Sequence, residues 1–401
     1  MKTVSPPTAL RMPPVATGVS LPSFDHHPLS RVVFEAGAIQ RLGQFARALG
    51  GSRILVVTDP GLEAAGHPQR ALASLHEAGL QTFLFDGVEE NPTTRHVASG
   101  LEFARRHQVD FIVAVGGGSS MDCAKGVNFL LTNGGKMADY KGMNKATKPM
   151  LPSIGVPTTA GTGSEAQSFA LIADEKTHLK MACGDRKAAF RLALLDPAVT
   201  VSQPVSVTVV TAIDAVSHAI ESYVSTRRNP WSQMFAREGW RLLEGSFETV
   251  LKTPTDLAAR GAMQLGAHYA GVAIENAMLG ACHACANPLT AHYGITHGVA
   301  IGILLPHVVR FNTAAVSGLY GDLVHDVGLV NGDSSAAGEV LAQRLTELLR
   351  LANLPTKLSD CGVSSTILPL LALEAAEQWT GRYNPIPVGE TELQGLYEAA
   401  L

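Results

Sequence analysis

The chain has 401 residues, 46% hydrophobic and 16% charged, so it can fill the cores of two or three domains and is not intrinsically disordered. Its 31 basic and 35 acidic residues give a net charge of −4 at pH 7, which argues against nucleic acid and anionic membranes as partners. Five cysteines are too few, and odd in number, for a disulfide-stapled secreted protein, and no apolar run reaches the roughly 18 residues that span a bilayer. We therefore expect a cytoplasmic protein that binds small molecules.

The first 30 residues differ from the rest of the chain, because five prolines fall within the first 22 positions. They contain no apolar core and no small-residue cleavage site of the kind found in secretory signals. We expect residues 1–30 to form a loose leader outside the folded domains.

Residues 31–131 alternate between short β-branched runs and segments with helical spacing. The apolar run at 53–59 is continuous, as in a strand buried on both faces of a parallel sheet. Strands are expected at 31–34, 53–59, 81–85 and 111–115, and helices at 38–49, 68–79, 93–107 and 121–131, the last capped by Ser119. This order predicts a doubly wound, Rossmann-like α/β domain with right-handed crossovers, whose ligands bind at the carboxyl ends of the strands.

From about Val201 the strand-like runs disappear, and Ala- and Leu-rich segments with helical spacing follow. Helices are expected at 207–225, 229–251, 255–286, 297–314, 338–352 and 366–381. We place the boundary near Asp196-Pro197, so that residues 31–200 form the α/β domain and residues 201–401 form an all-helical domain.

The Gly-Gly-Gly-Ser turn at residues 116–119 follows the last of these strands and precedes a helix. Backbone N–H groups at such a turn can hold a pyrophosphate, although it lacks the G-x-G-x-x-G fingerprint and a tight turn without a ligand is the alternative. Asp59, at the end of an earlier strand, can accept hydrogen bonds from an adenosine ribose and repel a 2′-phosphate, which favours NAD over NADP. The alternative for Asp59 is a turn aspartate ahead of Pro60.

Asp214 and His218 stand four residues apart and therefore share one face of the expected helix. A carboxylate and an imidazole so placed can chelate a metal ion, and a hydrogen-bonded pair without metal is the alternative. His283 and His297, in a small-residue apolar segment, complete a set of three imidazoles and one carboxylate. Such a set suits Fe²⁺ or Zn²⁺ and leaves a coordination position open for substrate.

Cys282 and Cys285 flank His283 at C-x-x-C spacing. A zinc–thiolate or redox site of this kind uses a second cysteine pair or opens a helix after a strand, and the sequence offers neither. If the segment is helical, His283 can face a metal while both thiols pack elsewhere.

At these residues the sequence resembles the iron-containing (group III) alcohol dehydrogenases, over nearly the whole chain from about Arg31. The resemblance rests on a series of motifs in order: Phe34-Glu-Ala-Gly37, Val57-Thr-Asp59, Asn91-Pro92, Gly116-Gly-Gly-Ser119 with Asp122 and Lys125, Pro157-Thr-Thr-Ala-Gly-Thr-Gly-Ser-Glu165, Asp196-Pro197, Asp214-Ala-Val-Ser-His218, and His283 through His297-Gly298. It implies an N-terminal NAD(P)-binding domain, a helical metal-binding domain and catalysis between them, in the fold that this family shares with dehydroquinate synthase.

The resemblance also implies a role for particular residues. The implied ligands of one divalent metal, usually Fe²⁺ in this family and Zn²⁺ in the alternative, are Asp214, His218, His283 and His297. The implied cofactor-binding residues are Asp59, Asn91, Gly116, Gly117, Gly118, Ser119, Asp122, Thr158, Thr159, Thr162 and Lys180. Residues 117–119 are expected to hold the pyrophosphate, the three threonines to lie along the adenosine side, and Asp122 and Lys180 to approach the nicotinamide ribose.

Two positions depart from the family pattern. Family members commonly carry a histidine four residues after the third metal ligand, where it is placed to relay the alcohol proton, and here that position is Asn287. A neutral amide can orient a water or a substrate oxygen but cannot take up a proton at neutral pH, so His292 or a water–ribose chain is the expected replacement. Thr296 stands where the family often has proline, which affects loop rigidity more than chemistry.

We therefore expect an NAD-dependent, metal-dependent alcohol dehydrogenase or aldehyde reductase acting on a small-to-medium primary alcohol or aldehyde. The expected substrate pocket draws on loops around Tyr140, Gly142, Met143, Phe169, Leu279 and Tyr383. The resemblance favours a homodimer, paired through the strand near Val32 and Val33, or a higher homo-oligomer. The alternatives are a zinc polyol dehydrogenase or a dehydroquinate synthase-like lyase of the same fold, and a non-enzymatic NAD- or metal-binding protein.

Overall fold

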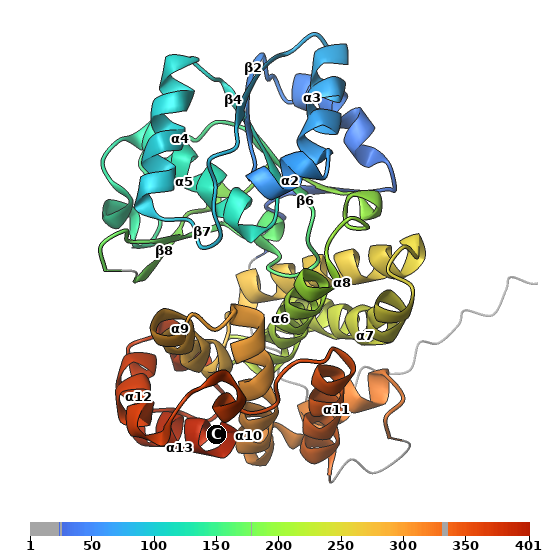
Figure 1. Cartoon of the computed structure of the whole chain (residues 1–401), viewed down its shortest axis with the longest axis vertical. Coiled ribbons are helices and arrows are strands. Elements are labelled where there is room, and N and C mark those ends of the chain that lie inside the picture. Colours follow the sequence, from blue (N-terminus) through green and yellow to red (C-terminus); the bar gives the residue numbers. More distant parts are fainter. Residues whose placement is uncertain (1–23, 25, 178, 331–335) are drawn as a thin grey trace, which may run out of the picture.

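The computed structural model describes residues 24, 26–177, 179–330 and 336–401, so most of the expected leader, residues 1–23 and 25, lies outside the described residues. All described strands lie between Arg31 and Leu195, and from Val205 onward the described chain contains only helices and loops. Figure 1 shows the strand-containing half above the helical half. An α/β sheet followed by a helical half confirms the predicted fold class.

The main sheet has six parallel strands in the order β1-β9-β6-β4-β2-β3. These strands are β1 (Arg31–Phe34), β2 (Arg53–Val57), β3 (Gln81–Phe85), β4 (Phe111–Gly116), β6 (Ser153–Pro157) and β9 (Leu192–Leu195). The chain runs outward from β2 to β3 and then returns to place β4 on the other side of β2. A doubly wound sheet forms its ligand crevice where the direction changes in this way, at the carboxyl ends of the strands.

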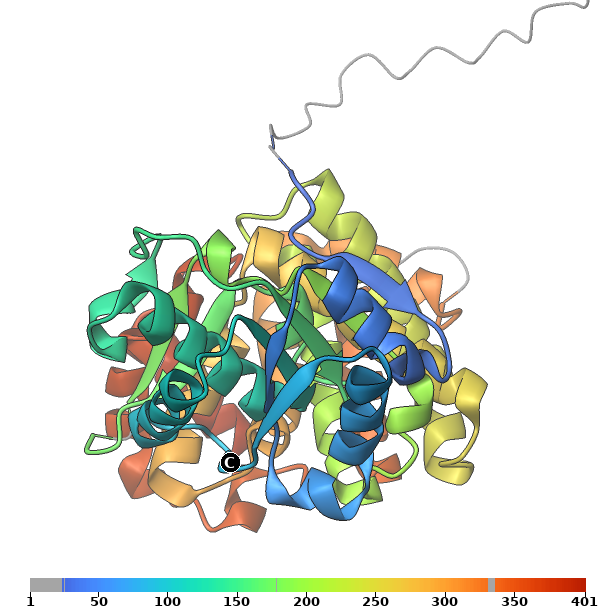
Figure 2. The same ribbon diagram turned by 90° about the horizontal axis from the view of Figure 1, so that it is seen from above.

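Helices cover both faces of the main sheet, because successive strand residues point to opposite sides. One set of β2 side chains packs with α1 (Leu42–Ala48) and α3 (His67–Glu77), and the alternate set packs with α4 (Thr94–Arg106) and α5 (Gly118–Asn133). Figure 2 shows these two helical layers on either side of the strands. Burial on both faces explains the continuous apolar run at β2.

The α/β half differs from the sequence predictions in two respects. Gly117 is the N-cap of α5, with an extended backbone at φ −80° and ψ −167°, so the prediction that Ser119 caps this helix is wrong. The pattern also does not predict β6, β9 or a small mixed sheet, β5-β8-β7, formed by β5 (Gly142–Met143), β7 (Phe169–Ala173) and β8 (Lys180–Gly184). These strands are short, and pairing across the fold stabilises them more than their local pattern does.

The described helical half contains eight α-helices. They are α6 (Val205–Val224), α7 (Pro230–Lys252), α8 (Leu257–Ala277), α9 (Ala281–Tyr293), α10 (His297–Asp326), α11 (Ala337–Leu351), α12 (Leu368–Ala376) and α13 (Glu390–Ala400). Helix α6 lies at the centre: 15 of its 20 residues are buried, and it packs against α7, α8 and α10.

Three helix predictions in this half need correction. The single helix predicted at 255–286 is two helices, because α8 ends at Ala277, Met278 takes a φ of +69° and Gly280 caps α9. The helix predicted at 297–314 continues to Asp326 across a non-helical Val316. The helix predicted at 366–381 ends at Ala376, and α13 lies beyond it. The break between α8 and α9 places His283 in the first turn of a new helix.

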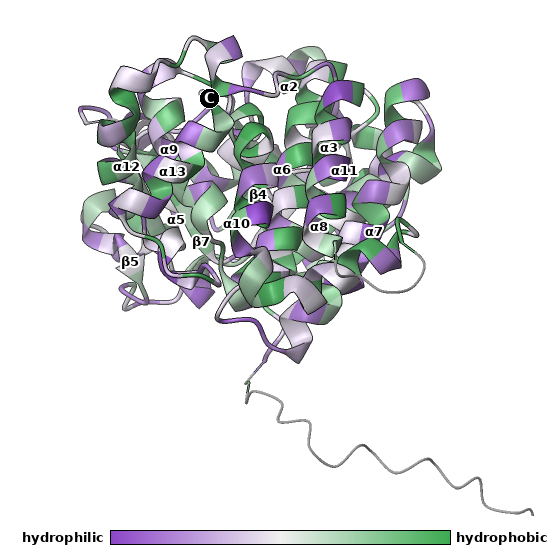
Figure 3. Cartoon of the chain, turned by 90° about the horizontal axis from the view of Figure 1, so that it is seen from below, coloured by the Kyte–Doolittle hydropathy of each residue, from purple (hydrophilic) through white to green (hydrophobic). Residues whose placement is uncertain are grey.

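Helix α10 is the only described helix that is long and apolar enough to cross a membrane by length and composition. It lies in the protein core, because 61% of its most apolar window is buried and its side chains belong to the main cluster of the helical half. Figure 3 shows that outer helices such as α7 and α11 carry both hydrophilic and hydrophobic residues, as expected for helices with one buried face.

Helix α8 holds the loop after β6 against the helical half. Three of its side chains bond to this loop: Gln264 to Pro157 O at 3.0 Å, His268 to Glu165 at 3.0 Å, and Glu275 to Ser168 N at 3.0 Å and Oγ at 2.6 Å. Gly163, at φ +60°, packs directly on Gly271, and a Cβ added to Gly163 would lie 2.6 Å from Gly271 Cα. The loop and the helix therefore form one close-packed contact.

We expect Gly163→Ala to lower the free energy of unfolding by about 2–4 kcal/mol, because it combines a left-handed backbone with overpacking. The matched control is Gly245→Ala in α7, where an added Cβ meets nothing within 4 Å. It should raise stability by about 0.5–1 kcal/mol, because alanine favours a helix. Denaturant unfolding of both variants measures the difference, and unchanged stability of Gly163→Ala would contradict the close packing.

Candidate metal and cofactor site

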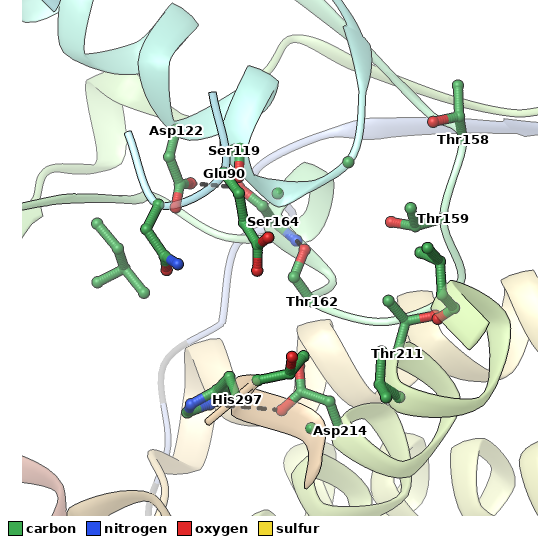
Figure 4. A pocket seen from close by; sticks show the side chains of 18 of the residues that line it. Glu90, Ser119, Asp122, Thr158, Thr159, Thr162, Ser164, Thr211, Asp214 and His297 are labelled. Atoms are coloured by element: carbon green, nitrogen blue, oxygen red, sulfur yellow. Dashed lines mark hydrogen bonds and ion pairs between the residues drawn. The ribbon is translucent and has the colours of Figure 1, made fainter. Parts of the chain in front are cut away.

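A cleft of about 1200 Å³ lies between the two halves. Side chains from the loops after β2, β4 and β6 face it from one side, and α6, α9 and α10 contribute from the other (Figure 4). The predicted cofactor residues that line it are Asp59, Asn91, Gly117, Gly118, Ser119, Asp122, Thr158, Thr159, Thr162 and Lys180. Gly116 does not line the cleft, because it ends β4 and the space beside its Cα is filled by Ser120.

Gly117 and Gly118 of the glycine turn pack closely against Thr159 and Thr162. A Cβ added to Gly118 would lie 2.7 Å from Thr162 Cγ2, and one added to Gly117 would lie 3.2 Å from Thr159 Cγ2. Glycine at both positions leaves the N-terminal N–H groups of α5 accessible from the cleft. Thr158 Oγ1 is buried without a hydrogen-bond partner among the described residues. The glycine turn can hold a pyrophosphate without a basic side chain.

Asp59 combines the two roles that the sequence left open. Its Oδ1 accepts a hydrogen bond from Leu62 N at 3.2 Å and so caps the short helix α2 (Pro60–Ala64). Its Oδ2 accepts from Ser120 Oγ at 3.3 Å, and the residue lines the cleft beside the glycine turn. Asp59 therefore caps the helix that follows the turn, and its carboxylate also lies where a ligand in the cleft can reach it.

Asp122 and Lys180 face the cleft from α5 and from the start of β8. Asp122 Oδ1 accepts a hydrogen bond from Ser164 Oγ at 2.7 Å, and burial raises the pKa of this carboxyl although Lys125, 3.9 Å away, acts in the opposite direction. Desolvation lowers the pKa of Lys180, and the carboxylates of Asp122 and others oppose that effect. The two side chains provide one acceptor and one cationic donor near the middle of the cleft.

Asp214 and three histidines form a buried cluster on the helical side of the cleft. The Nε2 atoms of His218, His283 and His297 lie 3.4, 3.6 and 3.7 Å from Asp214 Oδ1. Ligand atoms of Asp214, His283 and His297 all lie within 4.8 Å of one another, and the rings of His218 and His283 stack at 4.9 Å. Figure 4 shows Asp214 and His297 meeting below the glycine turn. The structure therefore brings all four predicted metal residues together.

Two potential metal-ligand atoms of the cluster lack a hydrogen-bond partner among the described residues. Asp214 Oδ1 and His283 Nε2 are buried and have no hydrogen-bond partner among the described residues, an arrangement that is costly without a further bound group. The side chain of His297 is 27% exposed, against 9% for Asp214, so the cluster opens toward the cleft at His297. One carboxylate and three imidazoles with an open side fit a divalent transition metal.

Burial and mutual charge set the ionisation of the cluster. Burial would raise the pKa of Asp214, but the neighbouring imidazoles hold it well below its usual range. Burial lowers the pKa of His218 and lowers that of His297 to about 3. Burial would also lower the pKa of His283, but the carboxylates of Asp214 and Glu221 on either side of its ring raise it to about 9. The ionised carboxylate and the neutral imidazoles of His218 and His297 are in the forms that bind metal, and His283 would release a proton when a metal binds.

The two cysteines of the C-x-x-C motif lie outside this cluster. Cys282 and Cys285 are completely buried, and Cys282 Sγ donates to Ile301 O at 3.4 Å. Desolvation raises the pKa of both thiols, which disfavours the thiolate that a metal or redox site needs. This geometry agrees with the prediction that both thiols pack away from the metal residues.

Both halves of the chain match known family models. One, described as "Iron-containing alcohol dehydrogenase", matches residues 29–197, and another, "Fe-containing alcohol dehydrogenase family, C-terminal", matches residues 208–401. The chain belongs to the iron-containing alcohol dehydrogenase family. This confirms the resemblance that the motifs indicated, and the protein is an oxidoreductase of the alcohol dehydrogenase type.

Three relatives illustrate the match to alcohol dehydrogenases. Alcohol dehydrogenase 4 of Schizosaccharomyces pombe is 35% identical over 95% of this chain and 88% of its own length. The NAD-dependent methanol dehydrogenase of Bacillus methanolicus is 33% identical over 88% of this chain and 93% of its own. The crystal structure of a 1,3-propanediol oxidoreductase superposes with a TM-score of 0.92 at 34% identity, covering 95% of this chain and all of that one.

The cleft of this alcohol dehydrogenase has apolar walls near the histidine cluster. Phe169 and Leu279 line it as predicted, together with Trp379, whose ring stacks on Phe169 at 5.7 Å. The other predicted pocket residues, which do not line the cleft, are Tyr140, Gly142, Met143 and Tyr383. Tyr140 packs in the α/β core with its hydroxyl bonded to Gly134 O, so it cannot reach a substrate.

Asn287 lines the cleft and is held by a second amide. Its Nδ2 donates to Gln378 Oε1 at 3.0 Å. His292, one of the two expected replacements for the missing histidine, does not line the cleft and instead pairs with Glu374 at 2.8 Å. This position argues against His292 as the proton acceptor.

The sequence prediction missed several residues at the site. Glu90 lines the cleft from a loop that no local pattern marks, and Gln378 lines it just after α12, in a segment predicted to be helical. Glu221 touches His283, and a signal for it does exist: Asp214, His218 and Glu221 follow at spacings of four and three on α6, which places them on one helix face.

Proposed function

We propose that this protein is an NAD-dependent, Fe²⁺-dependent alcohol dehydrogenase or aldehyde reductase for small-to-medium primary alcohols and their aldehydes. One observation carries the proposal: three imidazole Nε2 atoms converge on Asp214 Oδ1 at 3.4, 3.6 and 3.7 Å, in a cleft that is also lined by the glycine turn. The NAD-dependent methanol dehydrogenase among the relatives supports the choice of cofactor.

The proposed metal ligands are Asp214, His218, His283 and His297. Fe²⁺ agrees with the description of the family, and Zn²⁺ is the alternative because it accepts the same donors. A bound metal supplies a Lewis acid for the substrate oxygen, and NAD exchanges hydride with the substrate carbon. His297 lies at the exposed side of the cluster, so substrate approaches from the cleft at this residue.

The α/β half would hold the cofactor along the whole cleft. Asp59 would accept from the adenosine ribose, and backbone N–H groups of residues 117–119 would bind the pyrophosphate. Asp122 would accept from the nicotinamide ribose, and Lys180 would donate to it. The adenosine side would lie along Thr158, Thr159 and Thr162.

The substrate end favours a neutral alcohol of modest size. Phe169, Leu279 and Trp379 form an apolar wall that excludes water from the reacting carbon. Asn287 Nδ2 is engaged with Gln378, which leaves Oδ1 free to accept from a substrate hydroxyl or a water. Since an amide takes up no proton at neutral pH, we propose that the alcohol proton leaves through a water and ribose chain.

We also propose a homodimer. Strand β1 is an edge of the main sheet, and its side chains include Val32 at 43% and Phe34 at 44% exposure. An unpaired edge strand with exposed apolar side chains is a template for pairing with a second chain. A second copy of β1 would continue the sheet across the interface.

The test of the proposed function compares metal-stripped enzyme with enzyme reloaded anaerobically with Fe²⁺ or with Zn²⁺. NADH formation is measured across primary alcohols, diols and hydroxy acids. We expect turnover of neutral primary alcohols with the metal, loss of turnover after stripping, and at least about a hundredfold loss in His297→Ala, because it removes a ligand. Full turnover by the stripped enzyme would overturn the proposal.

Asp59→Ser tests the cofactor preference. Serine still caps α2, but it removes the carboxylate that would oppose a 2′-phosphate. The kcat/KM ratio of NADP to NAD should rise by at least about fivefold, because a carboxylate about 4 Å from a phosphate costs about 1–4 kcal/mol. Asp59→Glu, which keeps the charge, is the control, and an unchanged ratio in Asp59→Ser would refute the assignment.

Asn287→His introduces a titratable group at the substrate end without touching the proposed ligands. We expect an unchanged metal content and a new apparent pKa between about 5 and 8 in the pH profile of kcat. Asn287→Gln, which stays neutral, should add no such step. Loss of metal from Asn287→His would mean that this residue is closer to the metal than proposed.

A further inference from the structure

Glu221 contacts His283 on the side of the imidazole ring that faces away from Asp214. Its Oε2 lies 2.5 Å from His283 Nδ1, on the side of the ring away from Asp214, whose Oδ1 lies 3.6 Å from His283 Nε2. The imidazole is thus held between two carboxylates of the same helix, α6. The side chain of Glu221 is only 3% exposed, so water does not compete for this contact.

The other oxygen of Glu221 holds the backbone of α9. Gly280, the N-cap of this helix, has no side chain to satisfy the free N–H groups of the first turn. Glu221 Oε1 instead accepts from Cys282 N at 2.8 Å, and Asn384 Oδ1 accepts from Ala281 N at 3.3 Å. A carboxylate near these N–H groups is also favoured by the positive end of the helix dipole. The side chain of Glu221 therefore holds both the first turn of α9 and the imidazole of His283, which this turn carries.

The geometry points to Glu221 as the residue that positions His283 for the metal, which rests on the function proposed above. By accepting a hydrogen bond from Nδ1, Glu221 keeps a proton on that nitrogen and leaves Nε2, which faces Asp214 Oδ1, as the atom that would bind the metal. Both oxygens of Glu221 are already engaged, so it acts through His283 and does not itself ligate the metal.

Glu221→Gln cannot preserve both contacts. If the amide oxygen faces His283 Nδ1, the amide NH₂ faces the N–H of Cys282, and two donors meet. If the amide is turned round, its NH₂ faces Nδ1 and favours the tautomer with the proton on Nε2, where the metal would bind. Either arrangement weakens the metal site while the volume of the side chain is kept.

Gly280→Ala tests the same contact without changing Glu221. A Cβ added to Gly280 would lie 2.9 Å from Glu221 Oε1 and 3.0 Å from Asn384 Oδ1, so it must push the carboxylate aside. The control is Glu165→Gln, because Glu165 and His268 form another buried pair, 3.0 Å apart, that does not belong to the Asp214 cluster. This control reports the effect of neutralising any buried carboxylate beside a histidine.

The experiment measures the Zn²⁺ dissociation constant of metal-stripped full-length enzyme by competition with a chromophoric chelator. Circular dichroism and thermal melting check the fold of each variant. We expect Glu221→Gln and Gly280→Ala to bind Zn²⁺ about 10–100-fold more weakly than wild type, and Glu165→Gln to bind it as wild type does. If Glu221→Gln does not fold, Gly280→Ala decides.

The outcomes separate this inference from the proposed function. Wild-type Zn²⁺ affinity in the Glu221→Gln variant, or an equal loss in Glu165→Gln, would overturn the positioning role and leave the proposed metal site intact. A wild-type enzyme that takes up no metal would overturn both.

Discussion

The site depends on one constraint: the carboxylate of Asp214 is buried and needs positive or polarisable partners in place of water. Three imidazoles supply them, and two belong to residues at the start of a helix, His283 in the first turn of α9 and His297 as the first residue of α10. The helix break at residues 278–280, with Met278 in the left-handed region, sets His283 at such a start, and a continuous helix from 255 to 286 would not. The packing of the helical half thus places the first turns of α9 and α10 beside the carboxylate of Asp214.

Helix starts also explain how an acidic cleft could accept the anionic cofactor proposed above. Asp59, Glu90 and Asp122 line the cleft, and Lys180 is the one lysine or arginine among the described residues that line it. The positive ends of α5 and α10 lie at this cleft and contribute partial positive charge through N–H groups that no side chain caps. The N-terminal N–H groups of these helices would bind the anionic groups that arginine side chains bind elsewhere, and packing of the helices fixes the direction of these N–H groups.

Much of this arrangement could be predicted from the sequence. The four residues of the Asp214 cluster could be predicted from residue types, spacing and the family resemblance, and the structure brings them together. The small sheet β5-β8-β7 and the break after α8 were missed, since strand pairing and a left-handed Met278 arise from contacts between distant segments. The proposed substrate wall was predicted in part: Phe169 and Leu279 lie on it, whereas Tyr140 is a core residue and Trp379 follows the end of α12 in a segment predicted to be helical.

The contact between α8 and the loop after β6 bears on how such enzymes can be recombined. Thr158, Thr159 and Thr162 belong to the α/β half in sequence, yet Gln264, His268 and Glu275 of the helical half fix the loop that carries them. A chimera that joined the α/β half of one relative to the helical half of another would separate this loop from its anchors. The two halves are therefore not interchangeable modules, and an exchange of halves should carry residues 157–168 together with α8.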